Sequence, residues 1–477
     1  MKYLIYILVA FVLLVSAKTD KNYYNEKFRP QVHFSPEKNW LFEPSGFVYY
    51  FGEYLLFYQN VSIDKKLLTN KLGHAVSKDM VHWQNLPFAF VPDEKATDAS
   101  TCRPMAGSAV IDSLNLTGLQ QKDTRTMLIY YSDSKGDQNL AYSTDKGATW
   151  NKYAKNPVIS SLGLNSHDPK VFFHQPTGKW ILSLYREKGE NGKSPGISFY
   201  NSSDLLHWQF QSHLEGVGEC PDIFELKVEG NTNEKKWVIL SGEGEYKIGF
   251  FDGLTFKPET EMKKLDFGKN FFAAQTLSNA PDGKIIQIAW MRGGEYADMP
   301  FNGQMSFPTE LSMRSTRHGL VLCRKPVSTI LSLYDHDVIK KDKNLIPGIK
   351  GNLLSGLSGD AVFIKAVLQP KTSDTFGFII RNGKKSEGTD IQYDTSKKTL
   401  FVNGEKMFLE PIAGKIELEI IFDRSSIEVF GNNGETGIST CFSPIAGEEE
   451  MMLYTQGGEL FVESLEAHTL NSAWPKK

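Results

Sequence analysis

The chain has 477 residues and carries 53 basic against 56 acidic side chains, which leaves a net charge of −3. This near balance argues against a nucleic-acid partner, because binding to phosphates requires a strongly basic surface. The length allows two or three domains with apolar cores of their own. Four cysteines are too few for disulfides to be the main source of stability, and the sequence leaves open whether one pair of them is bridged.

Residues 1–17 have the features of a secretory signal. A short basic start is followed by an apolar run over residues 3–15 and a small-residue end, with cleavage expected after Ala17. The run is too short for a comfortable membrane span, and no later stretch approaches the roughly 18 apolar residues of one. We therefore expect a secreted, extracellular protein with no membrane partner after removal of the signal. Three glycosylation sequons fit export and begin at Asn60, Asn115 and Asn201.

An internal repeat over residues 28–326 predicts a five-bladed β-propeller. Five runs rich in β-branched and aromatic residues each follow a polar or glycine step, and they begin near Gly52, Thr126, Gly178, Lys236 and Gly283. A second phrase of serine, aspartate and tryptophan begins at Ser77, Ser143 and Ser202. Its period of roughly 50–60 residues is typical of large propeller blades. An irregular β-sandwich with chance similarity between its strands is the alternative.

The character of the sequence changes after Pro326. Residues 327–350 are rich in lysine and aspartate without a clear strand pattern, so we expect a linker or covering segment there. Short alternating strands follow over residues 351–477 and predict a β-sandwich. This second domain has no acidic group with the spacing that chemistry requires, and we expect it to stabilise the first. The predicted fold class is all-β, a five-bladed propeller followed by a C-terminal sandwich.

Three short acidic segments in the first domain carry the candidate chemistry. They are residues 40–46 (WLFEPSG), 166–170 (SHDPK) and 218–222 (GECPD). Their carboxylates lie close to prolines, in contexts that disfavour helix. Cleavage of a sugar linkage requires one group to attack or stabilise the anomeric carbon and another to protonate the leaving oxygen, while a third can hold ring hydroxyls. Three carboxylates therefore indicate a sugar-cleaving site.

These segments resemble those of glycoside hydrolase family 32, the invertases, inulinases and levanases. That family has a Trp-Met-Asn-Asp-Pro-Asn-Gly segment, an Arg-Asp-Pro segment and a Glu-Cys-Pro segment in the same order. Further similar segments are residues 57–59, 73–77, 107–110, 272–276, 305–308 and 423–430. The resemblance covers nearly all of the mature chain. It implies a five-bladed propeller joined to a β-sandwich, with the pocket at the propeller axis.

The resemblance also implies roles for the three carboxylates. Glu43 corresponds to the nucleophile, Glu219 to the acid/base, and Asp168 to the carboxylate that stabilises the transition state and holds fructose hydroxyls. The implied reaction is retaining hydrolysis of terminal β-D-fructofuranosides such as sucrose or short fructans. Such a reaction passes through an oxocarbenium-like state and needs neither a metal nor a cofactor. Histidines 33, 74 and 82 show no ligand-like grouping in the sequence, so no metal site is expected.

The first two motifs depart from the family pattern at the positions that should meet substrate. Glu43 stands where the family has aspartate, which moves the attacking oxygen roughly 1.5 Å further from the backbone. Phe42 and Ser45 replace asparagines, and His167 replaces an arginine, so a fixed bidentate donor gives way to a ring whose charge depends on pH. The residues expected to line the sugar pocket are Trp40, Phe42, Ser45, Gln59, Met105, Ala106 and His167.

These departures leave two hypotheses open. The first is an active β-fructofuranosidase of the invertase type, whose partner is a small sugar substrate. The second is a catalytically impaired descendant that binds fructosyl sugars or another protein, because a displacement of about 1 Å in an active site can cost on the order of a hundredfold in rate. The sequence does not predict the oligomeric state.

Overall fold

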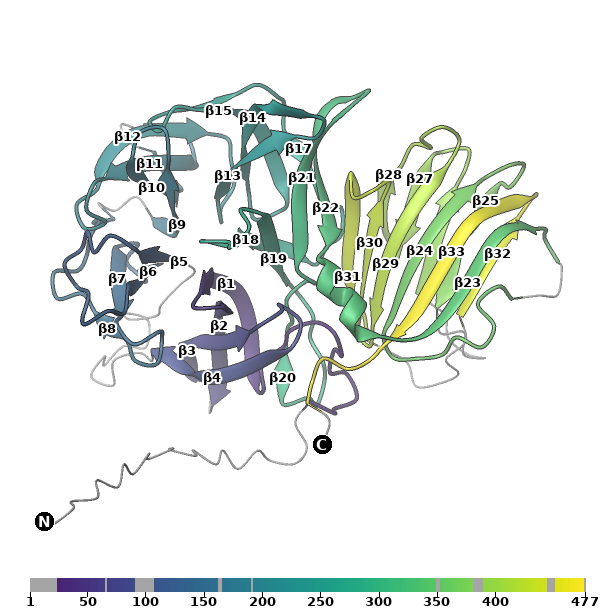
Figure 1. Ribbon diagram of the computed structural model, residues 1–477, viewed down its shortest axis with the longest axis horizontal. Helices are drawn as coiled ribbons and strands as arrows, with labels where there is room; N and C mark the ends of the chain where they lie inside the picture. Colours follow the sequence, from purple (N-terminus) through teal and green to yellow (C-terminus); the bar gives the residue numbers. More distant parts are fainter. Residues whose placement is uncertain are drawn as a thin grey trace, which may run out of the picture.

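The computed structural model of the protein describes residues 24–64, 67–90, 107–161, 165–189, 192–348, 352–380, 389–443 and 451–475. A ring of sheets formed by the first two thirds of the chain lies beside a pair of packed sheets formed by the last third (Figure 1). A short 3-10 helix, η2 (Ser328–Leu333), lies between the two domains. The protein is a five-bladed β-propeller followed by a β-sandwich, so the predicted all-β fold class is confirmed.

Each blade is an antiparallel sheet, and its first strand lies nearest the centre of the ring (Figure 1). Blade I contains β1 (Asn39–Tyr50), β2 (Glu53–Asp64), β3 (Leu67–Ser77) and β4 (Trp83–Phe90), with the short β20 (Phe301–Asn302) parallel to β1. Blade II contains β5 (Gly107–Asp112), β6 (Thr126–Ser132), β7 (Gln138–Ser143) and β8 (Asn151–Lys152). Blade III contains β9 (Ser166–His174), β10 (Lys179–Arg186), β11 (Gly196–Ser202) and β12 (Gln209–Glu215).

The last two blades share one larger sheet. Blade IV contains β13 (Asp222–Val228), β14 (Asn231–Leu240), β15 (Glu245–Phe251) and β16 (Phe256–Pro258), with β17 (Lys263–Lys264) paired to β15. Blade V contains β18 (Phe271–Thr276), β19 (Ile285–Met291), β21 (Thr309–Thr316) and β22 (Gly319–Pro326). A single bridge between Val228 and Met313 joins β13 to β21.

The recurring serine, aspartate and tryptophan build the turn between the third and fourth strands of a blade. In blade I, the Ser77 hydroxyl accepts the N–H of Met80 at 2.9 Å, and Asp79 accepts the N–H of His82 at 2.8 Å. The Trp83 indole then donates to the Met80 carbonyl at 2.9 Å. The same serine and aspartate contacts recur in the turns after β7 and β11. The repeat is therefore a structural device of the blades.

The inner strands of different blades approach closely at the axis. A Cβ at Gly46 of β1 would lie 2.9 Å from the Cβ of Ala109 in β5, so only glycine fits there without displacing its neighbour. The Val171 N–H of β9 donates to the Ser108 hydroxyl of β5 at 2.9 Å. The Gln275 amide of β18 donates to the Gly107 carbonyl. Side-chain contacts therefore join the inner strands of different blades where no backbone ladder does.

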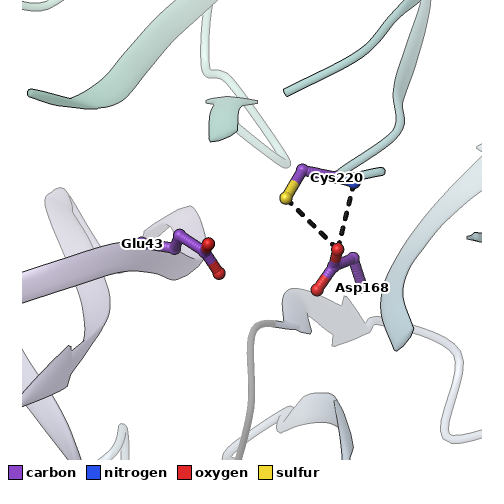
Figure 2. Close-up of side chains that lie close together, drawn as sticks. All are labelled: Glu43, Asp168 and Cys220. Atoms are coloured by element: carbon purple, nitrogen blue, oxygen red, sulfur yellow. Dashed lines mark hydrogen bonds between the residues drawn. The ribbon is translucent and has the colours of Figure 1, made fainter. Parts of the chain in front are cut away.

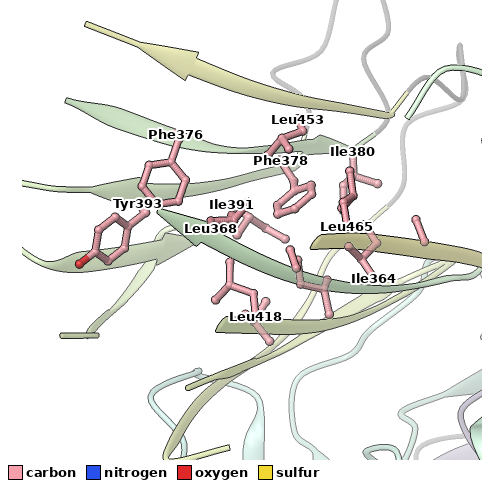
Figure 3. Close-up of a cluster of buried hydrophobic side chains, with 14 of the residues drawn as sticks. Ile364, Leu368, Phe376, Phe378, Ile380, Ile391, Tyr393, Leu418, Leu453 and Leu465 are labelled. Atoms are coloured by element: carbon pink, nitrogen blue, oxygen red, sulfur yellow. The ribbon is translucent and has the colours of Figure 1, made fainter. Parts of the chain in front are cut away.

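The second domain is a sandwich of two antiparallel sheets. One sheet has the order β23-β33-β24-β29-β30-β31, and the other has the order β28-β27-β26-β25-β32. The bounds are β23 (Tyr334–Leu345), β24 (Val362–Gln369), β25 (Thr375–Ile380), β26 (Thr389–Asp394), β27 (Thr399–Val402), β28 (Glu405–Phe408), β29 (Ile416–Asp423), β30 (Ser426–Gly431), β31 (Thr436–Cys441), β32 (Met451–Gln456) and β33 (Leu460–Leu470). Alternate residues of both sheets point inward and form one apolar core, which includes Phe376, Phe378, Ile391 and Leu418 (Figure 3).

The structure differs from the expected linker over residues 327–350. This segment contains η2 and then β23, which pairs antiparallel with β33 along the edge of the six-stranded sheet. Most side chains of β23 are exposed, which explains why its sequence lacks an apolar alternation. Charged residues such as lysine are typical of edge strands, where they discourage pairing with other chains.

Buried charges connect the two domains. His33, which precedes β1, places Nδ1 2.7 Å from Asp423 Oδ2 and Nε2 3.3 Å from Glu428 Oε2 in the sandwich. Burial alone would lower the pKa of His33, but its hydrogen bonds to the two carboxylates raise that pKa to about 9. Arg324 at the end of the propeller pairs with Asp266, which also accepts the Ser439 hydroxyl at 2.6 Å. The sandwich is thus tied to the propeller by ionic contacts as well as apolar packing.

Candidate active site

The three predicted carboxylates come from the inner strands of three different blades. Glu43 lies on β1, Asp168 lies on β9, and Glu219 lies in the turn that leads into β13. Figure 2 shows Glu43, Asp168 and Cys220 facing a common space near the centre of the ring. Side-chain ligand atoms of these three residues all lie within 4.8 Å of one another, as do those of His167, Asp168 and Glu219. The structure therefore brings the three acidic segments together.

Asp168 is the best-bonded carboxylate of the site. Its Oδ2 accepts a hydrogen bond from His167 Nδ1 at 2.8 Å. The same oxygen accepts bonds from the Cys220 N–H at 3.0 Å and from the Cys220 thiol at 3.2 Å (Figure 2). Asp168 and Cys220 both have left-handed backbone conformations, with φ of 61° and 54°. Burial opposes ionisation of Asp168, but the hydrogen bond and charge of His167 and the bonds from Cys220 lower its pKa. Asp168 is therefore ionised at neutral pH.

Glu43 is held by an amide and is poorly solvated. Its Oε2 accepts a hydrogen bond of 3.1 Å from Gln59 Nε2, and Gln59 Oε1 in turn accepts one of 3.3 Å from Asn70. Burial raises the pKa of Glu43 to about 8, and the negative charges of Asp168 and Glu219 add to this increase. The expected contact of Gln59 with the pocket is thus a direct bond to the candidate nucleophile.

Glu219 is the most accessible of the three carboxylates, with 49% of its side chain exposed. Burial and the charge of Asp168 raise its pKa, while His167 and Arg292 oppose the increase. Its backbone is fixed, because the Glu219 carbonyl accepts the N–H of Gly242 at 2.7 Å. Because the pKa values of Glu43 and Glu219 are both raised, we expect the site to keep a proton on one of these two carboxyl groups near neutral pH.

His167 supplies a positive charge between two of the carboxylates. Its Nδ1 faces Asp168, and its Nε2 lies 4.0 Å from Glu219 Oε2. Burial would lower its pKa, but the hydrogen bond to Asp168 and the charges of Asp168, Glu219 and Glu43 raise it to about 9. The ring is therefore an imidazolium at neutral pH. It restores a cation at the position where the family motif has arginine.

An aromatic wall lines one side of the site. The rings of Trp40 and Phe42 stack with centroids 6.3 Å apart, and Phe42 contacts Trp290 of β19 at 5.1 Å. Trp290 also contacts Phe272 at 6.2 Å, and the Arg292 guanidinium lies 4.0 Å above the Phe272 ring. Where the family motif has an asparagine amide, Phe42 thus provides an apolar ring that packs against Trp40 and Trp290.

Arg292 continues this wall toward solvent and pairs with Glu243 at 3.0 Å. Its charge reaches both Glu43 and Glu219, because it lowers the pKa of each. Arg292 and Glu243 were not predicted from the sequence, since no motif marks them. Phe272 and Trp290 carried a signal, because they lie in a family-like segment and in a repeated run, but that signal indicated structure and not a pocket wall.

The predicted pocket contacts of Ser45, Met105 and Ala106 are not seen in the described part of the structure. Ser45 is fully buried, and its hydroxyl donates to the Glu43 carbonyl at 3.5 Å, so the expected contact between Ser45 and substrate is not supported. Met105 and Ala106 lie outside the described residues. Cys102 does too, and the three cysteines that the structure describes, Cys220, Cys323 and Cys441, are all free.

The donor atoms of the site fit a hydrogen-bonded carboxylate cluster better than a metal centre. Asp168 Oδ2 already accepts three hydrogen bonds, and His167 Nδ1 provides one of them. Burial raises the pKa of the Cys220 thiol well above its ordinary value, so this group is a donor and not a thiolate ligand. The arrangement is suited to acid, base and nucleophilic chemistry by carboxylates.

The fold and this site define a class of protein, a β-propeller with a cluster of three carboxylates where its inner strands meet. Comparison with known proteins identifies the family. The family model described as Glycosyl hydrolases family 32 N-terminal domain matches residues 33–326, and that described as Glycosyl hydrolases family 32 C terminal matches residues 332–469. The chain belongs to glycoside hydrolase family 32, which confirms the resemblance seen in the sequence.

Individual relatives agree with this assignment. A levanase of Bacillus subtilis is 37% identical over 527 aligned residues, which cover 99% of this chain and 76% of the relative. A levanase of Bacillus sp. strain L7 is 31% identical, and the match covers 95% of this chain and 53% of that protein. The crystal structure of an exo-inulinase from Aspergillus awamori superposes with a TM-score of 0.84 at 25% identity, covering 94% of this chain and all of that one.

The structure also bears on membrane association. Among the described residues, no helix has both the length and the apolar character needed to cross a bilayer. The predicted signal, residues 1–17, lies outside the described part of the chain.

Proposed function

We propose that this protein is a secreted, retaining exo-hydrolase that removes terminal β-D-fructofuranosyl units from sucrose and short fructans. The observation that carries the proposal is the meeting of Glu43, His167, Asp168 and Glu219 on the propeller axis of a family 32 chain. Relatives named levanase, inulinase and invertase support the fructoside class of substrate. Extracellular inulinases among them, together with the predicted signal, support export.

In the proposed reaction, the Glu43 carboxylate attacks the anomeric carbon of the fructosyl unit. Glu219 donates its proton to the glycosidic oxygen as the bond to the leaving group breaks. Water then hydrolyses the fructosyl ester on Glu43, and Glu219 takes the proton from that water. Two displacements at one carbon retain the configuration. Asp168, kept ionised by His167, stabilises the positive charge that develops on the sugar.

This chemistry needs a proton on Glu219 and none on Glu43. Three contacts favour that location. Gln59 donates to Glu43 Oε2 at 3.1 Å and so stabilises its ionised form. His167 and Arg292 both lower the pKa of Glu43. Glu219 is the more exposed group and lies where a leaving group can approach from solvent.

A catalytically impaired fructoside-binding protein is the second candidate. The observation that favours it is the half-buried Glu43, whose pKa of about 8 leaves it largely protonated at neutral pH. Phe42 also lacks the amide that the family motif places beside the nucleophile.

A sugar panel separates the two candidates. Wild type, Glu43→Ala and Glu219→Gln are incubated with sucrose, inulin and levan, and fructose release is measured beside binding by calorimetry. The hydrolase proposal predicts turnover by wild type and its loss in both variants. Binding of fructosides by a folded wild type without any turnover would establish the second candidate.

A further inference from the structure

Three side chains from three blades meet in a buried cluster next to the catalytic carboxylates. They are Lys170 of β9, Asp222 of β13 and Thr276 of β18, and we call them the axial lock. Lys170 Nζ lies 3.0 Å from Asp222 Oδ1 and donates to the hydroxyl and carbonyl oxygens of Thr276 at 3.0 Å each. The Thr276 hydroxyl donates to Asp222 Oδ1 at 3.0 Å, and its N–H donates to Asp222 Oδ2. All three side chains are more than nine-tenths buried.

The hydrogen bonds within the lock are mutually consistent. A threonine hydroxyl has one proton and two lone pairs, so that of Thr276 can accept from Lys170 and donate to Asp222 at once. The hydroxyl therefore bridges a buried cation and a buried anion. A buried ion pair is tolerated when such additional bonds satisfy its remaining atoms, and removal of one partner leaves an uncompensated charge.

The lock separates the catalytic centre from the far side of the propeller axis. On one side, Lys170 lines a small void together with Asp168, Pro169 and Cys220. On the other side, Lys170 and Thr276 line a cavity of about 550 Å³ whose wall includes the exposed Leu114. The polar side chains of the lock thus lie between these two spaces, directly behind the carboxylates.

The lock also joins strands that no backbone ladder connects. Among the described strands, β9 belongs to a separate four-stranded sheet, whereas β13 and β18 belong to the large sheet of blades IV and V. Lys170 is two residues after Asp168, and Asp222 is three residues after Glu219. The distance between the two catalytic strands therefore depends on side-chain contacts, which include the lock, the bonds from Cys220 to Asp168 and the apolar packing of blades III and IV.

We propose that the axial lock sets the relative position of Asp168 and Glu219, and that Asp222 and Thr276 are positioning residues of this enzyme. The expected kinetic effect rests on the proposed function, whereas the expected structural effect rests on geometry alone. The lock acts through the two strands and does not touch the sugar. Its loss should affect the chemical step more than substrate binding, since a displacement of about 1 Å can cost on the order of a hundredfold in rate.

Thr276 offers the sharpest test, because Thr276→Val removes only the bridging hydroxyl and Thr276→Ser keeps it. We expect Thr276→Val to lower kcat about tenfold or more with little change in KM, and Thr276→Ser to stay close to wild type. Thr126→Val is the matched control. Thr126 is fully buried in β6 of blade II, and its hydroxyl has no hydrogen-bond partner in the part of the chain that the structure describes.

A second readout makes failure of the lock distinguishable from failure of the proposed function. The imidazole of His167 is titrated by NMR in wild type, Thr276→Val and Asp222→Asn, and is assigned with His167→Gln. Because Asp168 holds the His167 proton, displacement of Asp168 should lower the His167 pKa in both variants, whether or not the protein turns over sugar. If wild type is inactive, this titration alone decides the inference.

The inference is overturned if Thr276→Val keeps wild-type kcat and an unshifted His167 titration, or if Thr126→Val reproduces its effects. Where Thr276→Val does not fold, the same comparison is made with Asp222→Asn against wild type, and an unchanged titration there also overturns the inference.

Discussion

His167 and Asp168, adjacent in sequence, are joined side chain to side chain by a hydrogen bond of 2.8 Å between Nδ1 and Oδ2. The same oxygen accepts two bonds from Cys220, which leaves the other Asp168 oxygen for a ligand. The imidazolium also lies 4.0 Å from Glu219. A histidine at this position therefore supplies a charge that reaches both carboxylates, and its protonation couples the site to pH.

Removal of that charge should change the pH dependence of the reaction. His167→Gln takes away the charge that lowers the pKa values of both Asp168 and Glu43, so both rise and the acid limb of the kcat/KM profile moves to higher pH. We also expect kcat/KM at its optimum to fall by about tenfold to a hundredfold. His167→Arg is the control, because it keeps a cation there. An acid limb in His167→Gln at the wild-type pH would contradict this role.

The raised pKa values of Glu43 and Glu219 predict both limbs of the pH profile. The pKa of Glu43 is raised to about 8, and that of Glu219 is raised as well. As pH rises through the raised pKa of Glu219, its proton is lost and it can no longer act as acid. As pH falls below the pKa of Glu43, a proton neutralises the nucleophile. We expect a bell-shaped kcat/KM profile, measured between about pH 4 and 10. A profile that stays flat into the alkaline range would count against Glu219 as the acid.

Glu43→Asp restores the residue of the family motif and should slow this enzyme. The shorter side chain withdraws the carboxylate by roughly 1.5 Å from Gln59 Nε2, whose bond of 3.1 Å favours the ionised nucleophile. We expect kcat to fall about tenfold or more, as measured by fructose release from sucrose. Gln59→Leu should show a similar loss while keeping Glu43. A faster Glu43→Asp variant would show instead that glutamate is an impairment.

Some of the site was predictable from sequence, and the rest depended on contacts distant in the chain. Asp168 and Glu219 lie in segments that match the family closely, and their carboxylates do meet. Ser45 was expected in the pocket, but the register of β1 is irregular between Leu41 and Gly46, and Ser45 is fully buried there. Arg292 reaches the site from the fifth blade, and no local pattern marks such a residue.

The fold, too, was predictable from the sequence only where a local pattern marks it. The serine, aspartate and tryptophan repeat predicted blades because each turn forms its own hydrogen bonds locally. β23 was missed because a charged edge strand has no apolar alternation. The sequon at Asn60 is not available in the folded protein, since its side chain is 2% exposed and bonded to Asn39 and to the Lys38 carbonyl.

The ionic contact between the domains should make stability depend on pH. The folded-state pKa of His33 is about 9, above the ordinary value of 6.5, so its contribution is complete below about pH 6.5 and is lost as pH rises through 9. This pKa shift corresponds to a contribution on the order of 3 kcal/mol to the free energy of unfolding. Urea titrations of wild type and His33→Gln at several pH values test this. If the free energy of unfolding falls equally steeply with rising pH in the two proteins, His33 is excluded as the cause.

The role of Glu43 as the nucleophile of a retaining fructosidase can be tested by trapping its covalent intermediate. Glu219→Gln lacks the acid/base, so a fructosyl donor with a good leaving group should form the ester faster than water removes it. Rapid quenching, proteolysis and mass spectrometry then locate the adduct. We expect one fructosyl group on the peptide that contains Glu43, and none when Glu43→Ala is added. Reproducible fructose release without any adduct on Glu43, or an adduct on Asp168, would contradict it.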